Sequence, residues 1–130
     1  MYLFLDSRDF SRADFPSNSV WDFIVPFNEG LSAKTCSLVD IGVTSGKNGT
    51  AKFYRNQPLY VFCDIVEPSY VRERFLPLLK IVYKPGPVVK PYTMPVTHEN
   101  ITRIRLYILD SQLKTPSFEP ESLHCTLLLK

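Results

Sequence analysis

Apolar and polar residues alternate through the last third of the chain. Successive side chains of a β-strand point to opposite faces of a sheet, so residues of one kind at every second position predict a half-buried strand. Between 100 and 110 the apolar set is Ile104, Leu106 and Ile108, and the intervening set is Arg103, Arg105 and Tyr107. Near the C-terminus the apolar set is Leu123, Cys125, Leu127 and Leu129, and the opposite set is His124, Thr126 and Leu128. We therefore predict two strands that close the chain as a hairpin.

The same alternation predicts further strands upstream. Their ranges are 2–5, 20–27, about 36–44, 59–66 and 76–83. The run from Leu59 to Val66 is almost continuously apolar, which is typical of a central strand buried on both faces. The pair Asn48–Gly49 predicts a hairpin turn, and a short edge strand is expected at 51–58.

Two segments interrupt the strand pattern. Residues 67–75 begin with Glu67 and Pro68, which are favoured at a helix start, so a helical turn or a short helix is predicted there. An arginine-rich contact loop that uses Arg72 and Arg74 is the alternative for this segment. Residues 84–95 contain four prolines, which predicts an extended surface connection rather than a regular strand.

This pattern of elements predicts an all-β protein. About eight short strands separated by turns, with at most one short helix, favour a single eight-stranded jelly-roll antiparallel sandwich that spans 1–130 as one domain. An immunoglobulin-type sandwich is the main alternative. Trp21 precedes all three cysteines, so the cysteine–tryptophan–cysteine order of that fold is missing.

Composition narrows the class of protein. A chain of 130 residues with 45% apolar residues is long enough for one domain with a real core and argues against disorder. Fifteen basic and thirteen acidic residues are mixed along the chain without a basic N-terminal arm, so we expect no direct nucleic-acid binding. No apolar run approaches the roughly 20 residues that span a bilayer, so no membrane insertion is expected. The three cysteines, at positions 36, 63 and 125, cannot all pair within one chain, which favours a reducing compartment, the cytosol or the nucleus.

Candidate chemistry is sparse. His98 and His124 are the only histidines, and neither lies in a metal-ligand spacing. No nucleophile or phosphate-loop motif is present either, so we expect no enzyme activity, no cofactor and no metal. What remains is a protein contact surface, because exposed tyrosines and arginines are enriched where proteins meet; tyrosines that pack with only the hydroxyl exposed are the alternative reading. The candidate interface residues are Tyr54, Arg55, Tyr70, Arg72, Arg74, Tyr92, Arg103, Arg105, Tyr107, His124 and Leu128.

The order of segments in the second half of the chain carries a family resemblance. YVFCDIVEPSYV at 60–71 is followed by LPLLKIV at 76–82, PYTMPV at 91–96 and ITRIRLYILDSQLKTPSFEPESLHCTLLLK at 101–130. This order resembles the penton (minor capsid) proteins of the Polinton, or Maverick, and adintovirus group.

The resemblance implies a single jelly roll that forms homopentamers at the fivefold vertices of an icosahedral capsid, beside a double-jelly-roll major capsid protein. It also implies a virion protein that is assembled in the host cytoplasm or nucleus. Two other functions remain open at this stage: a carbohydrate-binding or other ligand-binding module, and an oligomeric module like the pentameric histone chaperones.

Overall fold

The computed structural model describes residues 1–6, 20–24, 30–45, 58–116 and 122–130, and this part of the chain is all-β. Its strands are β1 (Tyr2–Asp6), β2 (Val20–Ile24), β3 (Thr35–Ser45), β4 (Leu59–Cys63), β5 (Ser69–Val71), β6 (Arg74–Leu76), β7 (Leu78–Val82), β8 (Gly86–Pro87), β9 (Met94–Pro95), β10 (Arg103–Leu109) and β11 (Ser122–Leu129). The predicted all-β class is confirmed. The described ranges contain no helix with the length and apolar character that crossing a bilayer requires.

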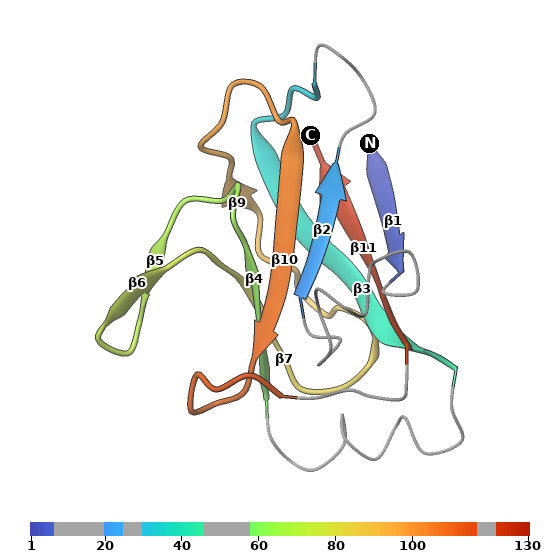
Figure 1. The fold of residues 1–130 in the computed structure, drawn as a ribbon, viewed down its shortest axis with the longest axis vertical. Helices are drawn as coiled ribbons and strands as arrows, with labels where there is room; N and C mark the ends of the chain where they lie inside the picture. The colour runs from blue at the N-terminus through green and yellow to red at the C-terminus, as the bar shows by residue number, and fades with distance from the viewer. Residues whose placement is uncertain (7–19, 25–29, 46–57, 117–121) are drawn as a thin grey trace.

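The strands form two main antiparallel sheets (Figure 1). Sheet A has the order β1-β11-β3-β8, and β9 also pairs with β3; sheet B has the order β2-β10-β4-β7. The chain passes repeatedly from one sheet to the other, so strands that are neighbours in sequence mostly lie in different sheets. Strands β5 and β6 pair only with each other in a small separate sheet.

The two closing strands do not form the predicted hairpin. β10 pairs with β2 and β4 in sheet B, whereas β11 pairs with β1 and β3 in sheet A. The prediction was wrong because a period-two pattern identifies the buried face of a strand but not its partner. The apolar faces of β10 and β11 belong to facing sheets and meet across the core instead of lying side by side.

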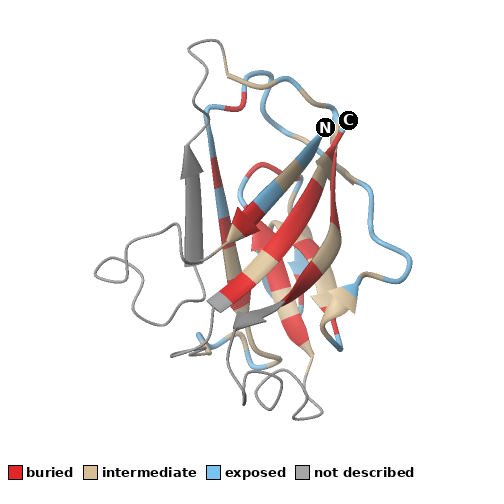
Figure 2. Ribbon diagram, turned by 90° about the vertical axis from the view of Figure 1, so that its right-hand side faces the viewer, coloured by how far each residue is buried: buried red, intermediate tan, exposed pale blue. Residues whose placement is uncertain are grey.

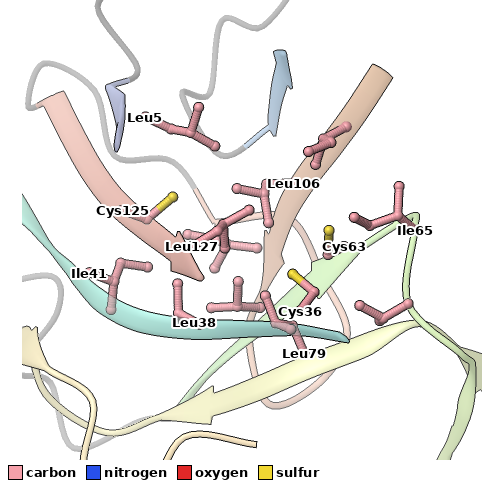
Figure 3. Close-up of a cluster of buried hydrophobic side chains, with 14 of the residues drawn as sticks. Leu5, Cys36, Leu38, Ile41, Cys63, Ile65, Leu79, Leu106, Cys125 and Leu127 are labelled. Atoms are coloured by element: carbon pink, nitrogen blue, oxygen red, sulfur yellow. The ribbon is translucent and has the colours of Figure 1, made fainter. Parts of the chain in front are cut away.

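One apolar core joins the two sheets, and Figure 2 shows buried positions alternating with less buried ones along the strands. Sheet A contributes Leu38 and Leu127 and sheet B contributes Leu79 and Leu106, all with no exposed surface (Figure 3). The apolar faces predicted for the closing strands are confirmed, since each member is at most 3% exposed. Such burial of branched side chains, at about 25 cal/mol per Å² of apolar area, is the main stabilising contribution to a sandwich of this kind.

The segment expected to start a helix is a β-hairpin. Strands β5 and β6 pair antiparallel, with Tyr70 opposite Phe75 and Val71 opposite Arg74. Aromatic and β-branched residues favour extended backbone, and this preference overrides the helix-start pair Glu67–Pro68. Arg72 adopts φ of 58° in the two-residue turn, the left-handed conformation that tight hairpins need.

Two other predicted elements changed in extent. β4 ends at Cys63 rather than at 66, because the chain turns there and the Val66 amide donates to the Cys63 carbonyl at 3.2 Å. The proline-rich stretch is mainly a connection, as predicted, but β8 and β9 pair with β3 over two residues each. The predicted turn at Asn48–Gly49 and nearly all of the edge strand at 51–58 lie outside the described residues.

Candidate subunit interface

The β5–β6 hairpin presents two aromatic rings to solvent. Tyr70 and Phe75 are 78% and 60% exposed, and their ring centroids lie 5.0 Å apart. Val71, on the other face of the hairpin, is buried. One face of the hairpin is therefore covered by the rest of the chain, and the other face carries an uncovered aromatic pair.

Two arginines of this hairpin interact with β10 and the loop that follows it. An Nη2 hydrogen of Arg72 is donated to the carbonyl oxygen of Ser111. Burial raises the pKa of Tyr107 on β10, and the nearby positive charge of Arg74 acts in the opposite direction. Arg72, which the sequence suggested as a contact residue, thus bonds to the loop after β10, and Arg74 lies near enough to β10 for its charge to act on Tyr107.

The outer face of sheet B is partly packed. Tyr107 stacks on Phe62 of the neighbouring strand β4, with ring centroids 4.9 Å apart and planes 12° apart. Phe62 has no exposed surface, although it lies outside the central core cluster. Tyr107 is half-buried, which fits the packed-tyrosine reading rather than a free contact residue. Arg103 and Arg105, on the same face of β10, are exposed.

Sheet A carries a second exposed aromatic pair. Tyr2 and Phe4 on the edge strand β1 are 57% and 78% exposed, with ring centroids 6.3 Å apart. Tyr2 lies opposite Leu128 in the β1–β11 register, so the pair and Leu128 share the outer face of this sheet. This is an apolar patch at the edge of the sandwich.

His124 lies on the same outer face and is held by its neighbours. Its Nε2 atom is 3.4 Å from Oδ2 of Asp40 on β3. Its ring covers Gly42, the residue opposite it in the register, so closely that a Cβ at position 42 would lie 2.9 Å from Cε1. The absence of a side chain at Gly42 therefore makes room for the imidazole.

The structure separates residues that the sequence analysis grouped on one contact face. The alternation pattern predicted Arg103, Arg105 and Tyr107 together with His124 and Leu128 on the polar side of one closing hairpin. That grouping was wrong, because the first three lie on the outer face of sheet B and the last two on the outer face of sheet A. Tyr54 and Arg55 lie outside the described residues.

Tyr92 belongs to a third region, a shallow groove beside β7. The Nζ atom of Lys80 lies 3.7 Å from the centroid of the Tyr92 ring. Tyr83, Lys84 and Val89 also line this groove, whose volume is about 250 Å³. Tyr83 is 72% exposed, so the groove combines open aromatic surface with positive charge.

Among the described residues, four exposed aromatic residues were not predicted from the sequence: Tyr2, Phe4, Phe75 and Tyr83. A signal for the first two was present. Leu3 and Leu5 occupy one face of the N-terminal strand, so Tyr2 and Phe4 must face outward if that strand belongs to a two-layer sandwich. Phe75 was assigned to a helix, and its exposure followed only once the hairpin was known.

The described residues hold no group of three or more His, Cys, Asp or Glu side chains placed to bind a metal ion. His98 is exposed and its Nδ1 atom lies 3.0 Å from Oγ1 of the adjacent Thr97. No protein-family model, no curated protein and no solved structure matches the chain.

Proposed function

We propose that this chain is a minor capsid (penton) protein that forms homopentamers at the fivefold vertices of an icosahedral capsid. Its neighbour in that capsid is a double-jelly-roll major capsid protein, and its location is the virion after assembly in the host cytoplasm or nucleus. The order of segments from 60 to 130, which resembles pentons of the Polinton and adintovirus group, supports this assignment.

The strand order gives independent support for the jelly roll that the proposal requires. In sheet A the first strand, β1, lies next to the last, β11; in sheet B the second strand, β2, lies next to β10. Nested pairing of this kind, first with last and second with second-last, is the pattern of a long antiparallel ribbon wound into two Greek keys.

The observation that carries the proposal is the pair of unlike aromatic patches on opposite sides of the molecule. The hairpin patch is Tyr70 with Phe75, and the edge patch is Tyr2 with Phe4 and Leu128. Figure 1 shows the β5–β6 hairpin and β1 at opposite sides of the sandwich. Exposed apolar patches commonly mark contact sites. Two unlike patches on opposite sides favour head-to-tail contacts, which form a ring when the rotation between neighbouring subunits closes and a filament when it does not.

Charge near the two patches supports contact between them. Arg72 and Arg74 lie on either side of Glu73 in the hairpin, which leaves a net positive charge beside its aromatic pair, whereas Asp6 follows the edge pair on β1. Opposite charges favour contact between unlike patches and disfavour contact between like ones.

The test begins with the mass of the purified 130-residue chain in solution. Size-exclusion chromatography with light scattering is expected to give about 75 kDa, five copies of the 15.0 kDa chain, and electron microscopy is expected to show fivefold rings. A protein that stays monomeric at micromolar concentration, even with the major capsid protein added, contradicts the proposal.

Two variants then test the head-to-tail geometry. Tyr70→Ser with Phe75→Ser removes the hairpin patch, and Phe4→Ser with Tyr2→Ser removes the edge patch; each is expected to be monomeric. An equal mixture of the two retains one intact patch of each kind, so it is expected to form dimers and no rings. Tyr83→Ser, which removes an equally exposed tyrosine outside both patches, serves as the matched control and is expected to assemble normally. Rings from either patch variant contradict the assignment of these patches to the interface.

The groove beside β7 favours a second candidate function, ligand binding. Tyr83 and Tyr92 give it open aromatic surface, and Lys80 supplies charge next to the Tyr92 ring. Aromatic surface of this kind suits sugar rings. Titration with a panel of neutral and acidic oligosaccharides, monitored by calorimetry, tests this candidate. Saturable sugar binding that is lost in the Tyr92→Ala variant favours the ligand-binding function. The absence of a binding heat with every sugar of the panel contradicts it.

A further inference from the structure

The three cysteines are all buried in the core, but they come from three different strands. Cys36 lies on β3 in sheet A, Cys63 ends β4 in sheet B, and Cys125 lies on β11 in sheet A. Cys36 and Cys63 have no exposed surface. Cys36 and Cys63 therefore face the core from opposite sheets.

The side chains of Cys36 and Cys63 lie near each other between the sheets. Figure 3 shows them as neighbours in the core, with Cys125 apart from them. The hydrogen bond with the Cys36 side chain is the main cause of the raised pKa of Cys63, and burial adds to it. For Cys125, burial is the main cause of the raised pKa. Cys36 raises this pKa further through its charge, without a hydrogen bond to Cys125. The close pair is thus Cys36 with Cys63.

The backbone around this pair holds the two sheets together. In the segment 94–97, Met94 and Pro95 pair with β3 on one side, where Met94 lies opposite Cys36. On the other side they bond to the chain that follows β4: the Glu67 amide donates to the Pro95 carbonyl at 2.9 Å, and the Thr97 amide donates to the Ile65 carbonyl at 2.9 Å. One segment therefore links the start of β3 to the end of β4. A disulfide between two sheets needs the Cα atoms of its cysteines within about 7 Å, which is closer than the roughly 10 Å that separates packed sheets. The link formed by residues 94–97 favours such a close approach of the two cysteines.

We propose that Cys36 and Cys63 form a reversible disulfide that joins sheet A to sheet B when the protein meets a small-molecule disulfide such as oxidised glutathione. The thiolate of one cysteine attacks the glutathione disulfide, forming a mixed disulfide and releasing one glutathione thiolate. The second cysteine thiolate then attacks the protein sulfur of that mixed disulfide and releases the second glutathione. Two protein thiols are oxidised, one glutathione disulfide is reduced to two thiols, and the two protons lost by the cysteines pass to the released glutathiones.

Burial sets the conditions of this reaction. Thiol–disulfide exchange needs a thiolate, and the pKa of Cys63 is raised. Both thiols are also fully buried, so the exchange requires local opening of the core. Once formed, the bond restricts the unfolded chain and resists unfolding. On the proposed capsid function, the bond would form after release from the reducing cell interior and stabilise the vertex; its formation in the isolated chain does not depend on that function.

The experiment uses the full-length chain incubated in glutathione redox buffer with sub-denaturing urea, followed by alkylation, intact mass measurement and peptide mapping. Because the two cross-linked cysteines do not react with the alkylating agent, we expect one alkyl group instead of three on the oxidised protein, and a loss of about 2 Da beyond that difference. We also expect a single Cys36–Cys63 cross-link and a rise in Tm of at least about 5 °C that dithiothreitol reverses. Cys125→Ala is the matched control and is expected to behave like wild type, whereas Cys36→Ala is expected to form no internal cross-link.

Four outcomes contradict the inference: a cross-link that involves Cys125, glutathione adducts without ring closure, free thiols throughout, or a lower Tm in the oxidised protein. Wild-type mapping gives this answer even if Cys36→Ala fails to fold. Because mass and mapping are independent of oligomeric state, a monomeric protein that forms the bond contradicts the capsid proposal alone. A pentamer without the bond contradicts the disulfide alone.

Discussion

The rings of Phe62 and Tyr107 stack 4.9 Å apart on the outer face of sheet B, outside the central core cluster. The pair joins the adjacent strands β4 and β10. Arg74 of the β5–β6 hairpin is close enough to act on Tyr107 electrostatically. The stack therefore lies at the junction between the sandwich and the hairpin that carries Tyr70 and Phe75.

Replacing Tyr107 with alanine is expected to destabilise the fold by about 2 kcal/mol, because a stacked aromatic pair and the burial of one ring are lost together. Urea unfolding monitored by tryptophan fluorescence measures this change. Tyr107→Phe keeps the ring and is the control, with an expected loss well below that of alanine. Equal losses for both variants would mean that the hydroxyl, rather than the stack, matters at this position.

Tyr107 also predicts a loss of stability at high pH. Burial raises its pKa above the ordinary value of 10.0, so the folded state favours the neutral phenol. For a pKa raised on folding, the stabilisation is complete below the unfolded-state pKa and is lost as the pH rises through the folded-state pKa. Wild type is therefore expected to lose stability relative to Tyr107→Phe above about pH 10. Urea midpoints of both proteins from about pH 8 to about pH 11 test this; a constant difference contradicts it.

The fold class was predictable because alternation depends only on which face of a strand is buried. Ile104, Leu106 and Leu127 were assigned to buried faces from spacing alone, and each is at most 1% exposed. Strand partners were not predictable in this way, since hydrogen bonding between strands involves backbone groups that every residue carries. The hairpin at 69–76 was missed because Glu67–Pro68 is a local helix-start signal, whereas β5 and β6 form strands by pairing with each other.

A tight backbone approach at Gly30 leads to a third prediction. Gly30 has φ of +74°, and a Cβ there would lie 2.9 Å from the Ile101 carbonyl oxygen, which accepts a hydrogen bond from the Leu31 amide. Gly30→Ala is expected to cost about 3 kcal/mol through strained backbone and loss of this bridge. Gly86 is the control, because it also has a positive φ, +107°, but no atom lies within 4 Å of a Cβ placed there. Gly86→Ala is expected to lower the free energy of unfolding by about 1 kcal/mol. Thermal unfolding compares the two, and equal costs would show that the contact with Ile101 is not limiting.

The candidate interface was less predictable than the fold. Composition favoured tyrosine and arginine as contact residues, and Tyr70 is among the most exposed side chains described. Tertiary packing determines which tyrosines are covered. Tyr107 is an example, because its position in β10 gives it the same outward direction as Arg105, yet Tyr107 is half-buried and Arg105 is exposed. Phe4 was overlooked because the polar or apolar character of a residue does not reveal that its strand is at the edge of a sheet.

Neighbouring residues of β10 provide the last prediction. Leu106 has no exposed surface and faces the core, whereas the Arg105 side chain is exposed on the outer face. Leu106→Asp is expected to prevent folding, because an unpaired carboxylate in an apolar core costs several kcal/mol out of a typical total stability of about 5–15 kcal/mol. Arg105→Glu is expected to fold, since the backbone amide of residue 105 still donates to Asp64 Oδ1. It is expected to weaken assembly, because it reverses the charge at an exposed position on the outer face of sheet B, the face against which the hairpin lies. Circular dichroism and light scattering on both variants separate these effects. A folded Leu106→Asp, or an Arg105→Glu that forms rings as readily as wild type, contradicts the corresponding part of this assignment.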